Sequence, residues 1–164
     1  MRRILVLIFV GLMVQPASAV VQGFTITGGV AANGGGMYFH SSGPTVRDCV
    51  IRGNRATGAG GGLFCSTNSF PTIINCVIDN NRSTRQGGGV YATTGTDVLI
   101  TDSIITGNVA FDDGGGVYAR RGEVAIRNVT FSGNRSSTAG GGVFTDLDAD
   151  VTVTSSILWD NTAP

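Results

Sequence analysis

The sequence predicts an all-β fold: a right-handed parallel β-helix of about five to six coils, with 25–27 residues in each coil. Two repeated motifs and one alternation pattern predict it. A Gly-Gly-Gly triplet followed by an apolar and then an aromatic residue occurs five times, with starts 26, 27, 27 and 26 residues apart. An apolar-x-x-Asn motif recurs in step with the triplet. Within each copy, apolar residues alternate with polar ones as they do along a strand.

The first 19 residues have the composition of a secretory signal peptide. Arg2 and Arg3 precede an apolar run over residues 4–14, and a small-residue Ala-Ser-Ala triplet ends at Ala19. A membrane anchor is the weaker alternative, because the run is shorter than the ~20 residues that a span needs. We expect cleavage after Ala19 and no transmembrane span in the mature chain. If the leader is retained, we expect residues 4–14 to form a helix over the first coil.

Residues 20–164 form the predicted repeat domain. Each copy holds about three short strands joined by tight turns, and a single copy cannot bury its apolar face, so the copies must stack. Stacking places equivalent apolar residues in ladders along the axis, at positions 46, 73, 100, 126 and 153 and at positions 51, 78, 105, 131 and 158. A left-handed hexapeptide solenoid and a β-propeller require other periods. We expect the domain to be incomplete at both ends, or to associate end to end, because an uncapped β-helix exposes strand edges.

These motifs resemble those of right-handed β-helix repeat proteins over residues 20–164. Gly60–Phe64 with Ile78-x-x-Asn81, and Gly114–Tyr118 with Phe131-x-x-Asn134, are similar to the GGA-aliphatic and FxxN motifs of the polymorphic outer membrane protein type of bacterial surface repeats. Glycine replaces the alanine of the first motif, and Ile or Leu replaces Phe in most copies of the second. The resemblance implies a pectate-lyase-like solenoid and a cell-surface location.

Two polar columns accompany the apolar ladders. The first is a predicted structural ladder of asparagines, which we expect to adopt left-handed turn geometry and to hydrogen-bond to the copies above and below. Its members are Asn54, Asn81, Asn108, Asn134 and Asn161. The second, here called the bend column, interrupts each copy between its apolar pairs: Asp48, Asn75, Asp102, Asn128 and Ser155. No two carboxylates adjoin in it, and we expect each intervening amide to donate to both neighbours.

The bend column also allows a catalytic interpretation. Asp48 and Asp102 lie two coils apart, which is near the upper end of the separation for an inverting carboxylate pair. Asn75 fills the space between them, so the ladder interpretation is favoured. Cys49 and Cys76 occupy adjacent coils, where parallel neighbours meet poorly for a disulfide torsion, and we expect free thiols.

Three further groups are candidate ligand-binding or metal-binding residues. An aromatic column on the outside of the coil is expected to stack on itself, with stacking against sugar rings as the alternative: Tyr38, Phe64, Tyr91, Tyr118 and Phe144. Arg55, Arg82 and Arg135 share one column, which suits either an acidic polysaccharide or a solvated face. Asp146, Asp148 and Asp150 are weak candidates for a calcium site, and a chance acidic loop is favoured.

Composition limits the classes of function. Of the 164 residues only 13% are charged, every basic residue is arginine, and His40 is the only histidine. After cleavage nine arginines would face eleven acidic residues, a formal charge of −2 that favours neither nucleic acid nor an anionic membrane. The hydrophobic content of 41% with few charges argues against intrinsic disorder.

The regularity of the copies bears on catalysis. No copy departs from the repeat with a convergent set of acid, base and metal ligands, so we predict no catalytic residue and no cofactor beyond the weak calcium candidate. We therefore predict an exported bacterial cell-surface or extracellular β-helix with a structural or adhesion role and with carbohydrate or cell-surface partners. The alternative is a polysaccharide-binding or polysaccharide-degrading protein, either a lyase or a glycoside hydrolase. Only Asp112-Asp113 and the 146–150 loop approach the acidic cluster that such an enzyme needs.

Overall fold

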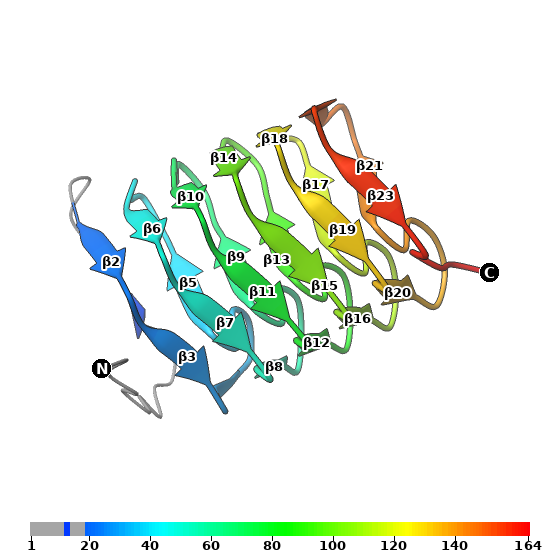
Figure 1. Ribbon diagram of the computed structural model, residues 1–164, viewed down its shortest axis with the longest axis horizontal. Coiled ribbons are helices and arrows are strands. Elements are labelled where there is room, and N and C mark those ends of the chain that lie inside the picture. Colours follow the sequence, from blue (N-terminus) through cyan, green and yellow to red (C-terminus); the bar gives the residue numbers. More distant parts are fainter. Residues whose placement is uncertain (1–11, 14–18) are drawn as a thin grey trace.

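The computed structural model describes residues 12–13 and 19–164. Throughout this part of the chain the regular elements are parallel β-strands, and successive coils lie side by side along the long axis of the molecule (Figure 1). Each coil passes through four sheets in the order B, C, D, A. The predicted all-β parallel β-helix is therefore confirmed.

Sheets B and C carry most of the core. Sheet B consists of β2 (Val20–Gln22), β6 (Thr45–Arg47), β10 (Thr72–Ile74), β14 (Asp97–Thr101), β18 (Glu123–Arg127) and β22 (Asp150–Thr154). Sheet C consists of β3 (Thr25–Thr27), β7 (Val50–Arg52), β11 (Val77–Asp79), β15 (Ile104–Thr106), β19 (Thr130–Ser132) and β23 (Ile157–Trp159). The central residue of each short strand points inward, so strand alternation alone builds the two apolar ladders.

Sheets D and A complete each coil. Sheet D has strands of two residues: β4 (Val30–Ala31), β8 (Arg55–Ala56), β12 (Arg82–Ser83), β16 (Val109–Ala110) and β20 (Arg135–Ser136). Sheet A consists of β1 (Leu12–Met13), β5 (Met37–Phe39), β9 (Leu63–Cys65), β13 (Val90–Ala92), β17 (Val117–Arg120) and β21 (Val143–Asp146). A complete coil thus has four strands, so the prediction of about three was wrong. The two-residue strands of sheet D are too short to show an alternation in the sequence.

The predicted ladders are in register. Val46, Ile73 and Ile100 pair directly in sheet B, and Ile51, Ile78 and Ile105 pair in sheet C. These six side chains have no exposed area. Stacking of like β-branched side chains therefore fills the interior, and each is worth about 1.5–3 kcal/mol relative to an exposed position. In the last coil Leu158 is 51% exposed and Trp159 is 69% exposed, because no further coil of the structure covers them.

Left-handed backbone marks two corners of each coil. In the bend column φ lies between 50° and 55°, which confirms that these residues turn the chain between sheets B and C. The ladder asparagines do not have positive φ, so that part of the prediction was wrong. The left-handed residue is the one before each of them, Gly53, Asn80, Gly107, Gly133 or Asp160. A short polar residue or glycine is needed there because a Cβ disfavours this region.

The glycine triplet has a steric cause. Gly60, the first of its triplet, has φ +68°. A Cβ on Gly62, the third, would lie 2.7 Å from the carbonyl oxygen of Gly89 in the next coil and 3.0 Å from the Asn81 side-chain nitrogen. The triplet therefore lets adjacent coils approach and leaves room for the asparagine ladder.

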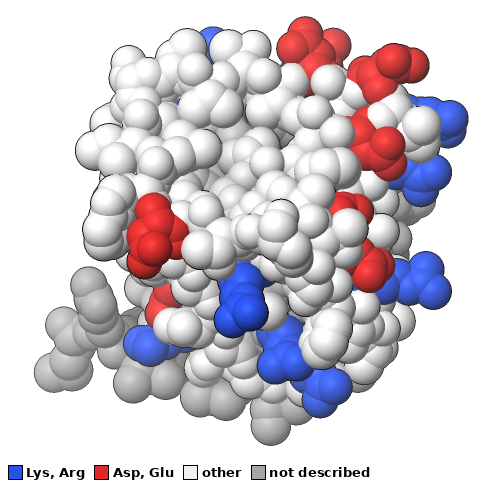
Figure 2. Space-filling view, turned by 90° about the vertical axis from the view of Figure 1, so that its right-hand side faces the viewer, with Lys and Arg blue, Asp and Glu red and all other residues white. Residues whose placement is uncertain are grey.

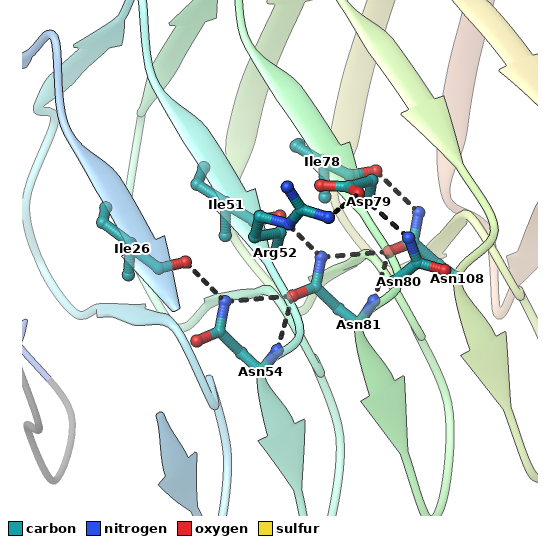
Figure 3. A network of polar contacts seen from close by, with 9 residues as sticks. All are labelled: Ile26, Ile51, Arg52, Asn54, Ile78, Asp79, Asn80, Asn81 and Asn108. Carbon is teal, nitrogen blue, oxygen red and sulfur yellow. Dashed lines mark hydrogen bonds and ion pairs between the residues drawn. The ribbon is translucent and has the colours of Figure 1, made fainter. Parts of the chain in front are cut away.

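The asparagine ladder connects the coils at the boundary between sheets C and D (Figure 3). The side-chain nitrogen of Asn81 donates to the carbonyl oxygen of Ile51 at 2.9 Å and to the Asn108 Oδ1 at 3.0 Å. The same Oδ1 accepts the backbone N–H of Asn81 at 3.0 Å. Equivalent bonds join Asn54 to Asn81, Asn108 to Asn134, and Asn134 to Asn161. The predicted contacts between copies are confirmed, and they satisfy groups that are almost wholly buried.

The leader prediction concerns residues that mostly lie outside those described. Within residues 4–14 the structure describes Leu12 and Met13, which form strand β1 and pair in parallel with Met37 and Tyr38 of β5. The expected helix is wrong for these two residues, because the edge of sheet A offers them backbone hydrogen bonds.

Candidate ligand-binding groove

The aromatic column stacks on the outer face of sheet A. One ring projects from each of β5, β9, β13, β17 and β21, because it follows the inward-facing residue of its strand. Neighbouring ring centroids lie 4.9–5.6 Å apart with interplanar angles of 3–16°. The predicted self-stacking is confirmed. Tyr91 is 7% and Tyr118 is 3% exposed, so much of the column forms a second apolar cluster outside the main core.

This stacking changes what the column can bind. Phe64, Tyr91 and Tyr118 each have both ring faces covered by neighbouring rings. A sugar ring needs an open aromatic face, so these three side chains can offer only their edges. Stacking of sugars on the middle of the column is therefore excluded by geometry.

A shallow groove of about 470 Å³ runs beside the column. Its walls come from four successive coils, and the polar groups in them are the side chains of Asn33, Arg85, Gln86 and Arg120. Phe64 and Tyr91 form part of its apolar wall. The Oδ1 atom of Asn33 accepts the backbone N–H of Ala59 at 3.0 Å, which fixes this side chain at the wall.

The predicted arginine column lies in sheet D, next to the turn that carries Arg85. Arg55 and Arg82 are direct neighbours in register, whereas Val109 separates Arg82 from Arg135. The guanidinium of Arg82 lies 4.8 Å from the ring centre of Phe111, a cation–π contact. We call Arg55, Arg82, Arg85 and Arg135 the arginine edge; all four are exposed, and none forms an ion pair with any described residue.

Figure 2 views the molecule from its C-terminal end. Blue arginine groups gather along the lower edge, which in Figure 1 carries β8, β12, β16 and β20, and red acidic groups gather toward the upper right. Arg85 and Arg120 could not be found from the repeat, because arginine recurs at neither position in the other coils. The only available signal was their place in the turns that flank the aromatic residues.

Acidic side chains border the groove at its C-terminal side. Asp146 accepts a hydrogen bond from the Tyr118 hydroxyl at 2.7 Å and lies 4.0 Å from Arg120 Nε. Burial, followed by this hydrogen bond, raises the pKa of Tyr118. Burial also raises the pKa of Asp113, and the negative charges of Asp112 and Asp146 add to that effect. A carboxyl group with a raised pKa can serve as a proton donor.

The calcium candidates do not converge. Asp146 is engaged with Tyr118, whereas Asp148 and Asp150 line a separate hollow of about 430 Å³ that also holds Glu123. Among residues 12–13 and 19–164, no three histidine, cysteine, aspartate or glutamate side chains are placed to hold a metal ion. The sequence analysis missed an acidic column in sheet B, where Asp97, Glu123 and Asp150 are in register.

The bend column is held by amides. Asn75 donates to Asp48 at 2.7 Å and Asn128 donates to Asp102 at 2.6 Å. In the described residues neither amide also donates to a second carboxylate, so the expectation of double donation was wrong. The amide hydrogen bonds are the main cause that lowers the pKa of both aspartates.

Two other sequence expectations can be compared with the structure. All three cysteines, Cys49, Cys65 and Cys76, are buried and free. Charge pairing between coils, expected for Arg52 and Asp79, is confirmed at 3.6 Å.

Comparison with known proteins supports the motif resemblance. The family model described as a right handed beta helix region matches residues 61–164, and a Chlamydia polymorphic membrane protein repeat matches residues 48–66. Searches of curated proteins and of solved structures give no match. In the described part of the chain, no helix has the length and apolarity to cross a membrane.

Proposed function

The chain belongs to the right-handed β-helix family, and from this premise we propose that it is an exported bacterial surface or extracellular protein with a structural or adhesive role. The observation that carries the proposal is the match of residues 48–66 to a repeat of a bacterial membrane protein. The composition of residues 1–19 supports export, and the continuous ladders support a rigid body that holds side chains at fixed spacing.

The proposal is tested by expressing the full chain in a bacterial host. We expect mass spectrometry to find a chain that begins at Val20, and we expect extracellular protease or surface labelling to reach it. Beads coated with the processed protein should adhere to host or bacterial surfaces more strongly than beads coated with a protein of similar charge. An uncleaved chain confined to the cytoplasm would contradict the proposal.

A polysaccharide-binding or polysaccharide-degrading role is the second candidate. The groove favours it, because Arg85 and Arg120 line the groove while Asp113, whose pKa is raised, lies beside Asp112 and Asp146 near one side. Degradation is tested by incubating the protein with polygalacturonate and alginate, with and without calcium. New unsaturated or reducing ends that are absent with Asp113→Asn would establish it, and no new ends with either protein would reject it.

A further inference from the structure

We propose that the arginine edge and the adjoining groove form one binding site for a linear anionic glycan, a polymer that carries sulfate or carboxylate groups. The proposal rests on the adhesive function proposed above and names the chemistry of its partner. The polymer would lie parallel to the axis of the solenoid and cross several coils.

The first argument is an uncompensated pair of like charges. Arg55 and Arg82 are exposed on adjacent strands, which lie about 4.8 Å apart in a sheet. Like charges directly opposite each other are destabilising. Elsewhere the molecule avoids this cost: Arg52 faces Asp79, and the bend column alternates aspartate with an amide. An external anion would remove the repulsion that no described carboxylate relieves.

The second argument is the placement of hydrogen-bond donors. Arg85 follows Arg82 by three residues and reaches the groove, and Arg120 lines the groove from the next coil. The amides of Asn33 and Gln86 add neutral donors in the same groove. A guanidinium group forms paired hydrogen bonds with a sulfate or carboxylate, so donors repeated from coil to coil suit a polymer with repeated anionic groups.

The third argument separates a glycan from a nucleic acid. Proteins that hold single strands without sequence preference stack bases on open aromatic faces, and the rings beside this groove have their faces covered. Asp112, Asp113 and Asp146 lie near the groove and would repel a polymer with a phosphate at every unit. A glycan with hydroxyl groups between its anionic groups meets both constraints.

The experiment measures binding of the processed protein to four polymers: heparin, polygalacturonate, neutral dextran and oligothymidylate. We expect binding to one or both anionic glycans, weakened by added salt, and little binding to the other two. The test variant is Arg82→Gln combined with Arg85→Gln. The matched control is Arg127→Gln, an exposed arginine on β18 in sheet B that removes one charge far from the groove.

We expect each arginine of the site to contribute about two- to fivefold, so the double variant should bind about tenfold more weakly. Arg127→Gln should change the affinity less than twofold, and circular dichroism should show the same fold for all proteins. Equal weakening by the control, equal binding of dextran, or tighter binding of oligothymidylate would each overturn the site. If the double variant is still exported and adheres as before, the site is wrong while the adhesive function stands.

Discussion

Replacement of Asn108 by alanine should strongly destabilise the protein. The substitution removes four hydrogen bonds: two that Asn108 Oδ1 accepts from Asn81, and two that its side-chain nitrogen donates to Ile78 and to Asn134. All lie in the buried ladder, and the backbone N–H of Asn81 loses its acceptor. At a net ~1 kcal/mol for each bond, the free energy of unfolding should fall by about 4 kcal/mol.

The assay is urea unfolding followed by far-ultraviolet circular dichroism, because strands make up the signal in every coil. Asn33→Ala is the matched control: this exposed side chain accepts a single hydrogen bond, from Ala59, and its loss should cost about 0.5–1 kcal/mol. The reasoning would be refuted if both variants lost the same amount. It would also be refuted if Asn108→Ala unfolded within about 1 kcal/mol of the parent protein.

Three further outcomes are expected. Gly62→Ala should cost about 2 kcal/mol in urea unfolding, since the new Cβ would press on Gly89 of the next coil; an unchanged midpoint would contradict the steric account. Asn75→Gly keeps the left-handed corner and removes the donor, so the pKa of Asp48 should rise toward 3.8 in an NMR titration. Because the lowered pKa stabilises the fold above that value and is lost as the pH falls through it, this variant should also be less sensitive to acid. Tyr91→Ala should cost about 3 kcal/mol and reduce the near-ultraviolet dichroism of the stacked rings; retention of that signal would argue against coupling along the column.

The fold could be predicted because the same residue types recur at a fixed period. Ile51, Ile78 and Ile105 must occupy equivalent positions if coils stack, and equivalent positions in a parallel solenoid are neighbours in space. The location of the left-handed corner could not be read from the asparagines. Asparagine suits both a turn and a buried ladder, and only the coordinates separate Asn80, which turns the chain, from Asn81, which does not.

The candidate site was harder to predict than the fold. Arg55 and Arg82 belong to a repeated column, whereas Arg85 and Arg120 occur once each and become neighbours of the same groove only through the turns of different coils. The sequence also left the aromatic column with two roles. Ring spacing settled them, because rings that cover one another have no face left for a sugar.

The two edges of the solenoid differ in how freely their lengths can change. Between each ladder asparagine and the next glycine triplet lie five residues without exception, and the backbone of this arc bonds directly to the arcs above and below. The turns between sheets A and B vary in length from one coil to the next. Insertions would therefore be accepted on one side of the molecule, where they would project into solvent, while the opposite side keeps the coils at constant pitch. A lineage of such proteins could diversify its outer turns without altering the scaffold that presents them.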